Sequence, residues 1–329
     1  MDMRRNPVTF RRFHGKRGLT IILALFAGGA DLCVAENLQT LVNRLFQGKV
    51  GAAIVSDPHT GRILALWNPE IAFKQAYTPG STAKLVASAA ALEEYRISPS
   101  ETIMCRRVPR LLGEPFHCSH PPVAQPYDLA TALANSCNYF FSELSTRLSS
   151  PTLAHWYAAF GFAAGGEDGS PGEVQISDKP REKALATLGE QGVTATPAQV
   201  LSAYSAIASG GRVYHLILPG QRKAPSLERE VPLRKSTLDI LTTGLRACVE
   251  EGSCHAAAVP GVSVAGKTGT APALDGSRVT DAWFVGFAPA DAPEVALVVF
   301  LKRGTGGNDA APLAAKILKQ CFALRKPTP

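Results

Sequence analysis

Short apolar runs lie near both ends of this chain, and longer helix-like segments fill the middle. Residues 50–56 (VGAAIVS) and 62–67 (RILALW) are joined by turn residues, which predicts a β-hairpin. Later strand-like runs cover 262–268, 281–288 and 294–301. Helical patterns cover 82–95, 128–148, 151–160, 197–209, 236–249 and 311–324. One sheet assembled from the two ends of the chain, with helices inserted between them, fits this order best and predicts a mixed α/β (α+β) fold.

The formal net charge of +7 is unevenly distributed along the 329 residues. Residues 1–35 carry six Arg or Lys against two Asp, so the rest of the chain carries only +3. That part contains no basic run with interleaved aromatic residues, which argues against a nucleic-acid partner.

The same 35 residues resemble an export signal. Cationic residues precede an apolar stretch at 18–30, which is too short to cross a bilayer comfortably. Small residues at Cys33 and Ala35 favour cleavage after Ala35, and the alternative is a short uncleaved anchor. A lipoprotein signal at Cys33 is disfavoured by the bulky Leu32 before it. In each case residues 36–329 are expected outside the cytoplasm, in the periplasm or cell envelope, as a single domain.

The cysteines outside this segment agree with an oxidising compartment. Cys248 and Cys254 flank a Glu-Glu-Gly turn, and we expect a disulfide between them. Cys105 and Cys118 bracket a Pro-rich loop, where we expect a second disulfide.

The alternative for that loop is a metal site, because His117 and His120 flank Cys118. The sequence shows no CxxC pair and no second cluster beside it. The disulfide is therefore favoured, and no metal is predicted.

Ser81 and Lys84 form a Ser-x-x-Lys motif at the first turn of the Ala-rich segment 82–95, which contains no Gly or Pro. Residues i and i+3 share a helix face, so the hydroxyl and the amine are expected to point the same way. A desolvated lysine amine has a lowered pKa and can accept the serine proton. About one such motif is expected by chance in a chain of this composition, and a surface lysine beside a cap serine is the plain alternative.

Two further motifs follow in order. Ser136-Cys137-Asn138 could offer a hydroxyl that relays protons and an amide that holds a carbonyl, although a polar break in a helical region explains it equally well. Lys267-Thr268-Gly269-Thr270 ends a strand-like run, where an exposed backbone could pair with an extended peptide. Gly269 removes a side chain where a substrate would approach, and the plain alternative is an ordinary edge strand. All three motifs together are expected by chance only about 0.03 times, and in this order they are the signature of penicillin-binding proteins and serine β-lactamases.

The sequence resembles the transpeptidase domain of penicillin-binding proteins, of the class B type, from about residue 50 to 320. The stretches that carry the resemblance are YTPGSTAKL (77–85), ALANSCNYFF (132–141), GVTATPAQV (192–200), AGKTGTA (265–271) and DAWFVGFAP (281–289). The resemblance implies a five-stranded antiparallel sheet flanked by helices, with a helical subdomain at roughly 96–195. Only 46 positions separate Ala35 from Ser81, so a catalytic domain without an N-terminal pedestal is expected.

The resemblance also implies roles for the motif residues. Ser81 would attack the penultimate D-Ala carbonyl of a stem peptide with Lys84 as base, forming an acyl-enzyme. Ser136 and Lys267 would pass a proton to the leaving amine, while Asn138 orients the substrate.

In the third motif, Thr268 and Thr270 would hold the substrate's terminal carboxylate beside Gly269. The backbone N–H groups of Ser81 and Thr270 would form the oxyanion hole. Peptidoglycan stem peptides and β-lactams are the implied ligands, and a cell-wall glycosyltransferase or another envelope protein is a candidate partner. No cofactor is implied.

Three alternatives to a D,D-transpeptidase stay open: a D,D-carboxypeptidase, a serine β-lactamase, and a non-catalytic β-lactam sensor or scaffold. A class A β-lactamase needs a water-activating glutamate in a Glu-x-x-Leu-Asn loop. The nearest match, which begins at Glu182, lacks the asparagine. Intact Ser, Lys, Asn and Thr side chains argue against a vestigial site.

Overall fold

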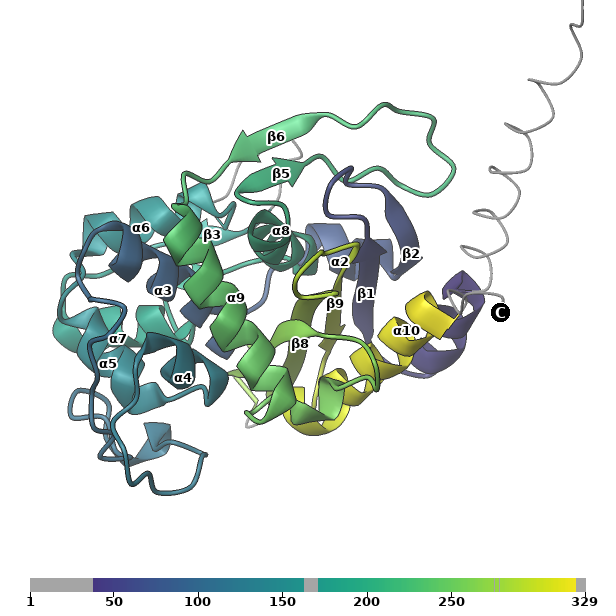
Figure 1. The fold of residues 1–329 in the computed structure, drawn as a ribbon. Helices are drawn as coiled ribbons and strands as arrows, with labels where there is room; N and C mark the ends of the chain where they lie inside the picture. Colours follow the sequence, from purple (N-terminus) through teal and green to yellow (C-terminus); the bar gives the residue numbers. More distant parts are fainter. Residues whose placement is uncertain (1–37, 163–170, 275, 278, 324–329) are drawn as a thin grey trace, which may run out of the picture.

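A computed structural model describes residues 38–162, 171–274, 276–277 and 279–323. Its centre is one five-stranded sheet in the order β2-β1-β9-β8-β7, in which all neighbouring strands are antiparallel (Figure 1). The strands are β1 (Gly51–Ser56), β2 (Ile63–Trp67), β7 (Ala265–Pro272), β8 (Thr280–Ala288) and β9 (Val295–Leu301). The predicted sheet built from both ends of the chain is therefore confirmed, with β1 and β9 joining the two halves.

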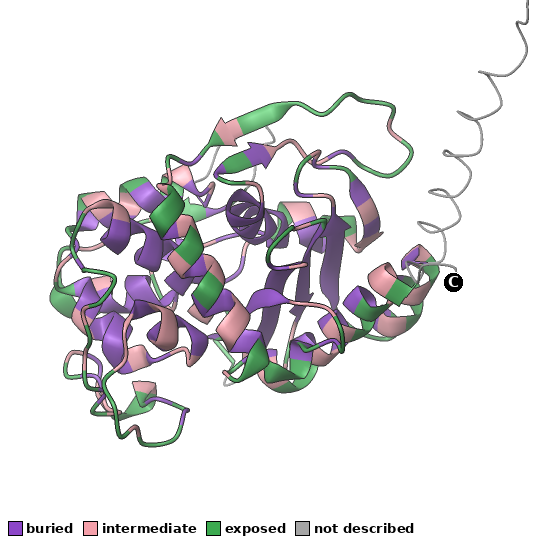
Figure 2. Cartoon of the chain, in the orientation of Figure 1, coloured by how far each residue is buried: buried purple, intermediate pink, exposed green. Residues whose placement is uncertain are grey.

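The alternation of side chains along the strands builds two hydrophobic layers. In β8, Trp283, Val285 and Phe287 point into one layer, and Phe284 points into the other; all four are fully buried. Helix α8 (Pro197–Ala208), buried along its whole length, covers the first face of the sheet. The helix at 38–46 and α10 (Ala311–Ala323) cover the second. Figure 2 shows the strands buried between these helices.

The remaining helices gather mainly at one side of the sheet (Figure 1). They are α3 (Lys84–Glu93), α4 (Leu129–Ala134), α5 (Asn138–Ser145), α6 (Ser150–Ala159), α7 (Pro180–Leu188) and α9 (Lys235–Glu250). Helix α9 packs on α4 and β7 and so connects this helical group to the edge of the sheet.

Two short helical segments matter for the site described below. The 3-10 turn η1 (Gly80–Ala83) leads directly into α3, and η4 (Gly306–Ala310) leads into α10. The other short elements are α2 (Pro69–Lys74), η2 (Glu114–Phe116), η3 (His255–Ala257), β3 (Glu173–Val174), β4 (Val193–Thr194), β5 (Arg212–Tyr214) and β6 (Leu227–Glu230).

Two sequence predictions need correction. The helix expected over 128–148 is divided into α4 and α5, because Ser136 adopts a left-handed backbone with φ 53° that no helix can continue through. The strand expected at 262–268 begins at Ala265 and runs on to Pro272, so the Lys267–Thr270 motif lies inside the strand and not at its end.

The predicted export signal, residues 1–35, lies outside the described residues. Within the part that the structure describes, no helix is both long enough and apolar enough to span a bilayer.

Candidate active site

Ser81 and Lys84 lie where the turn η1 passes into helix α3. Ser81 lies in η1 and is half-buried. Lys84 is the first residue of α3, and its side chain is fully buried. The spacing of three residues brings the two functional groups together, and Lys84 Nζ lies 2.9 Å from Ser81 Oγ. The pairing predicted from the Ser-x-x-Lys spacing is therefore present in the structure.

The second motif reaches the same amine from the break between α4 and α5. Lys84 Nζ lies 2.9 Å from the Ser136 carbonyl oxygen, 3.2 Å from Ser136 Oγ and 2.6 Å from Asn138 Oδ1. The left-handed φ at Ser136 accompanies this arrangement, in which one residue presents both its carbonyl and its hydroxyl to Lys84. Asn138 donates from Nδ2 to the Phe116 carbonyl at 3.1 Å, which fixes the amide plane.

The surroundings of Lys84 make its amine easier to deprotonate than that of an ordinary lysine. Burial lowers its pKa from 10.5 to about 8, although nearby acidic groups, among them Glu190, act in the opposite direction. Four oxygen atoms surround Nζ, one more than either an ammonium group or a neutral amine can bond at once. A neutral amine can donate two hydrogen bonds and accept a third from the Ser81 hydroxyl, which is the arrangement that a general base requires.

The third motif approaches the site on β7, the edge strand of the sheet, which packs against η1. A Cβ atom at Gly269 would lie 2.9 Å from the Pro79 carbonyl oxygen and 3.1 Å from Thr82 Cγ2. The absence of a side chain at Gly269 therefore allows β7 to approach the turn that carries Ser81. From sequence, the same glycine was expected to make room for a substrate.

Lys267 is fully buried, and both burial and the charge of Lys84 lower its pKa. Its Nζ donates to the Thr268 carbonyl at 3.2 Å. Among the hydrogen bonds of the described residues, none joins Lys267 to Ser81 or Ser136. Lys267 thus places a second buried amine close to Lys84 without a direct bond to the serines.

The hydroxyls of the two threonines both have protein partners. Thr270 is exposed at the sheet edge, and its Oγ1 accepts from the Gly306 N–H at 3.0 Å. Thr268 Oγ1 donates to the Ser253 carbonyl at 3.4 Å and lies 3.6 Å from Cys254 Sγ. Of the two, the exposed Thr270 is the one that a ligand along the edge of β7 can reach from solvent.

Cys248 and Cys254 form a disulfide with an S–S distance of 2.07 Å. This bridge lies behind the third motif, because Cys254 Sγ accepts from the Thr268 N–H at 3.2 Å. It links the end of α9 to the residue that precedes η3, and so supports β7 from the side opposite β8.

The second expected disulfide is not formed, which corrects the sequence prediction. Cys105 and Cys118 are free thiols whose Sγ atoms lie 3.6 Å apart. That separation exceeds the roughly 2.05 Å of a disulfide bond, and Cys137, from the middle of the second motif, lies 3.7 Å from Cys118 Sγ, so three sulfur atoms share one buried centre.

One acidic residue near Lys84 was missed by the sequence analysis. Glu190 follows helix α7, and burial raises its pKa to about 7, while the Lys84 charge acts to lower it. Glu182, the glutamate considered from sequence, lies instead at the exposed start of α7 and pairs with Lys179. The sequence offered one indication of Glu190: it is the one acidic residue between Gly189 and Gly192, directly after a helix.

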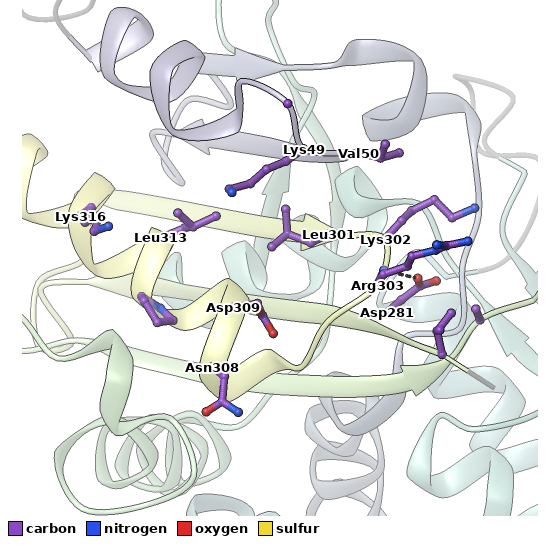
Figure 3. A pocket seen from close by; sticks show the side chains of 14 residues that line it. Lys49, Val50, Asp281, Leu301, Lys302, Arg303, Asn308, Asp309, Leu313 and Lys316 are labelled. Carbon is purple, nitrogen blue, oxygen red and sulfur yellow. Dashed lines mark hydrogen bonds between the residues drawn. The ribbon is translucent and has the colours of Figure 1, made fainter. Parts of the chain in front are cut away.

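A surface pocket of the described residues lies elsewhere. This pocket, of about 710 Å³, is lined by Lys49 before β1, Lys302 after β9, Asp309 of η4 and Lys316 of α10, among others (Figure 3). The N–H of Arg303 donates to the Asp281 carboxylate at 3.3 Å in its wall. No residue of the three motifs lines it, so the candidate active site is identified by its chemistry and not by cavity volume.

Comparison with known proteins agrees with this geometry. The family profile "Penicillin binding protein transpeptidase domain" matches residues 51–319. Peptidoglycan D,D-transpeptidase PbpA of Mycobacterium tuberculosis is 28% identical, in an alignment that spans 82% of this chain and 66% of that protein. Stage V sporulation protein D of Bacillus subtilis is 29% identical over 78% of this chain and 43% of that protein. The chain thus spans about two thirds or less of the length of these curated relatives.

Solved structures share the fold. The D,D-transpeptidase domain of a peptidoglycan glycosyltransferase from Eggerthella lenta superposes with a TM-score of 0.76 at 24% identity, covering 88% of this chain and 82% of that one. Penicillin-binding protein A of M. tuberculosis, solved as a ceftriaxone acyl-enzyme complex, gives a TM-score of 0.74 at 24% identity, covering 86% and 77%. With the family profile matched over most of its length, this chain belongs to the penicillin-binding protein transpeptidase domain family.

Proposed function

We propose that this chain is a serine D,D-transpeptidase that cross-links peptidoglycan through an acyl-enzyme on Ser81, and that β-lactams acylate the same serine. The observation that carries the proposal is the 2.9 Å contact between Ser81 Oγ and Nζ of the buried Lys84. The names of the relatives, which include peptidoglycan D,D-transpeptidases from several bacteria, support the choice of substrate.

In the first half-reaction, neutral Lys84 accepts the hydroxyl proton of Ser81 while Oγ attacks the carbonyl carbon of the penultimate D-Ala. The peptide C–N bond then breaks, and the leaving amine of the terminal D-Ala takes up a proton. Ser136 is placed to relay that proton, because its Oγ lies 3.2 Å from Lys84 Nζ. In the second half-reaction an acceptor amine attacks the ester, loses a proton and restores the Ser81 hydroxyl.

The edge strand β7 is the proposed binding surface for the donor peptide. An extended peptide can add to an unpaired strand edge through backbone hydrogen bonds. The amine of Lys267 and the exposed hydroxyl of Thr270 can donate hydrogen bonds to a ligand that carries a terminal carboxylate. Asn138, already oriented by its bonds to Lys84 and Phe116, is the proposed contact for a substrate amide.

A labelled penicillin tests acylation directly. The expected result is one stoichiometric adduct, mapped to Ser81 by peptide mass spectrometry and absent from Ser81→Ala. An adduct retained in Ser81→Ala would overturn the assignment of the nucleophile.

The rate of label loss then distinguishes the possible reactions. Slow loss, with cross-linked dimers formed from a pentapeptide donor and an amine acceptor, supports the transpeptidase. Release of D-Ala without dimers would indicate a carboxypeptidase, and rapid turnover of nitrocefin would indicate a β-lactamase. Stable acylation without either peptide product would indicate a sensor or scaffold.

The proposed setting is the cell envelope, since the substrate lies outside the cytoplasm. Residues 1–35 are the proposed export signal, and a cell-wall glycosyltransferase or another envelope protein is the proposed partner class. Fractionation of cells that express the full chain, followed by N-terminal sequencing, tests export; an N-terminus that begins after Ala35 is expected in the envelope fraction.

A further inference from the structure

Four buried side chains converge next to the candidate active site: Cys105, Cys118, His120 and Cys137. Their ligand atoms all lie within 4.8 Å of one another. We propose that these four residues bind a single zinc ion, which fixes the second motif in place. The proposal concerns a site separate from the Ser81 chemistry and does not rest on the proposed function.

The distances between the ligand atoms fit a tetrahedral metal. The Sγ atoms of Cys105 and Cys118 are 3.6 Å apart, those of Cys118 and Cys137 are 3.7 Å apart, and Cys105 Sγ lies 3.7 Å from His120 Nε2. Zinc–sulfur bonds of about 2.3 Å at tetrahedral angles place two sulfurs roughly 3.8 Å apart. A disulfide would need about 2.05 Å and would leave the third thiol and the imidazole without a function in the cluster.

The imidazole of His120 is oriented for metal binding. Its Nδ1 lies 2.8 Å from the Pro121 carbonyl oxygen, so Nδ1 carries the proton and Nε2 presents its lone pair toward Cys105. A metal-binding histidine commonly donates its other ring N–H to a carbonyl in this way, which fixes both the tautomer and the ring.

Each of the three sulfurs also accepts a backbone N–H. Arg107 N–H donates to Cys105 Sγ at 3.3 Å, Tyr139 N–H to Cys118 Sγ at 3.3 Å, and Phe140 N–H to Cys137 Sγ at 3.4 Å. Backbone donors of this kind stabilise thiolates, the form of cysteine that binds a metal.

Arg107 closes the loop around the cluster. Its guanidinium donates to the His120 carbonyl at 2.9 Å and to the Cys118 carbonyl at 3.1 Å. Three thiolates and one Zn²⁺ carry a net charge of −1, and the nearby guanidinium offsets part of it. The donor set of three sulfurs and one nitrogen suits zinc and not calcium or magnesium, which prefer oxygen ligands.

The position of Cys137 gives the metal a consequence for the active site. Cys137 separates Ser136 from Asn138, and both of these residues contact Lys84. The Cys105–His120 loop also holds Asn138 through the Phe116 carbonyl. A zinc ion that ties this loop to the start of α5 would therefore fix Ser136 and Asn138 relative to Lys84, so we assign it a positioning role.

Metal content of the purified full chain tests the site. Protein stripped with a chelator under reducing conditions and reconstituted with Zn²⁺ should hold about one zinc per chain by elemental analysis. His120→Asn should lose the metal. His117→Asn is the matched control: His117 is exposed, three positions earlier in the same loop, and should keep full occupancy.

A cysteine pair gives a second comparison. Cys118→Ser should lose zinc, whereas Cys321→Ser, which removes a free cysteine outside the cluster, should retain it. Because a cluster variant can fail to fold, the wild-type chain is also titrated with Co²⁺. Tetrahedral sulfur ligation should then produce visible d–d bands and a sulfur-to-cobalt charge-transfer band at one equivalent.

Two outcomes would overturn the proposal. One is wild-type protein that takes up neither Zn²⁺ nor Co²⁺. The other is a Cys105–Cys118 disulfide, found by non-reducing peptide mapping, in protein purified with Zn²⁺ and without reductant.

The positioning role has its own readout. The zinc-loaded chain should be acylated by penicillin about 10- to 100-fold faster than the reduced, metal-free chain. Equal rates would overturn the positioning role. Absence of acylation in both forms would contradict the proposed function, while the metal content still decides the zinc site.

Discussion

At the residue scale, the site depends on one buried amine. Lys84 contacts Ser81, Ser136 and Asn138, and its burial lowers the pKa to about 8. In the proposed mechanism the neutral amine is the base, so acylation by penicillin should speed up as pH rises through about 8 and level off above it. Second-order acylation rates measured from pH 6 to 10 check this expectation. A rate that falls as the pH rises across this range would exclude Lys84 as the base.

Glu190 gives a prediction on the same amine. Its negative charge raises the Lys84 pKa, and with its own pKa of about 7 it is mostly ionised at pH 8. Glu190→Gln removes that charge, so the rise of the acylation rate should move to lower pH. Glu182→Gln changes a partly exposed glutamate at the start of α7; it is the control and should leave the profile unchanged. An unchanged profile in both variants would show that Glu190 does not influence Lys84.

Local spacing explains what could be predicted about individual residues. Ser81 and Lys84 are three positions apart, so helix geometry alone predicts that they meet. Cys137 lies outside the loop between Cys105 and Cys118, and no periodic pattern in the sequence indicates that the three thiols lie together. The disulfide prediction failed for this reason: Cys105 and Cys118 looked like a pair because the sequence did not indicate that Cys137 lies beside them.

At the element scale, the site requires strand β7 to lie against turn η1. Gly269→Ala would place a Cβ 2.9 Å from the Pro79 carbonyl oxygen, so the strand or the turn must move. We expect a loss of about 1–3 kcal/mol in unfolding free energy from overpacking. The rate of penicillin acylation should fall by about tenfold or more, because small displacements of reacting groups are costly.

A glycine nearby provides the control for that substitution. Gly307→Ala adds a Cβ whose nearest neighbour is 3.9 Å away, so it should keep both stability and acylation rate. Thermal unfolding measures the stability of the two variants, and acylation kinetics measure whether the close approach of β7 to η1 is required. A Gly269→Ala protein with wild-type acylation would show that the close approach is not required.

Periodicity predicted most helices and strands but not their interruptions. The apolar pattern continues across 128–148, whereas the chain breaks at Ser136 to bring the second motif to Lys84. The break is stabilised by contacts with a residue far away in sequence, and such contacts leave no trace in local propensity.

At the scale of the whole molecule, the order of elements was sufficient to predict the sheet. Strands near both ends and helices between them leave few arrangements other than one sheet closed by the two ends. The strand order β2-β1-β9-β8-β7 itself required the structure, since β1 pairs with β9 across almost the entire chain. The hydrophobic pattern had predicted five strand-like runs, and the family resemblance implied the same number.

This closure by both ends makes a global prediction. Phe46, from the helix at 38–46, is fully buried in the layer that also contains Leu297 of β9 and Ile317 of α10. Phe46→Ala should cost about 3–5 kcal/mol in unfolding free energy. For a domain of this size that corresponds to a fall in melting temperature of roughly 5–8 °C.

The active site lies on the opposite face of the sheet, next to the layer that contains α3 and α8. Below its melting temperature, Phe46→Ala should therefore be acylated by penicillin at the wild-type rate, and acylation should be lost on heating together with the secondary structure. Val50→Ala, at a residue that is 59% exposed, is the control and should melt like the wild type. Circular dichroism and acylation followed over the same temperatures provide both readouts. Loss of acylation well before the loss of secondary structure would show that the two halves of the molecule unfold separately, and would contradict a single cooperative unit built from the two ends of the chain.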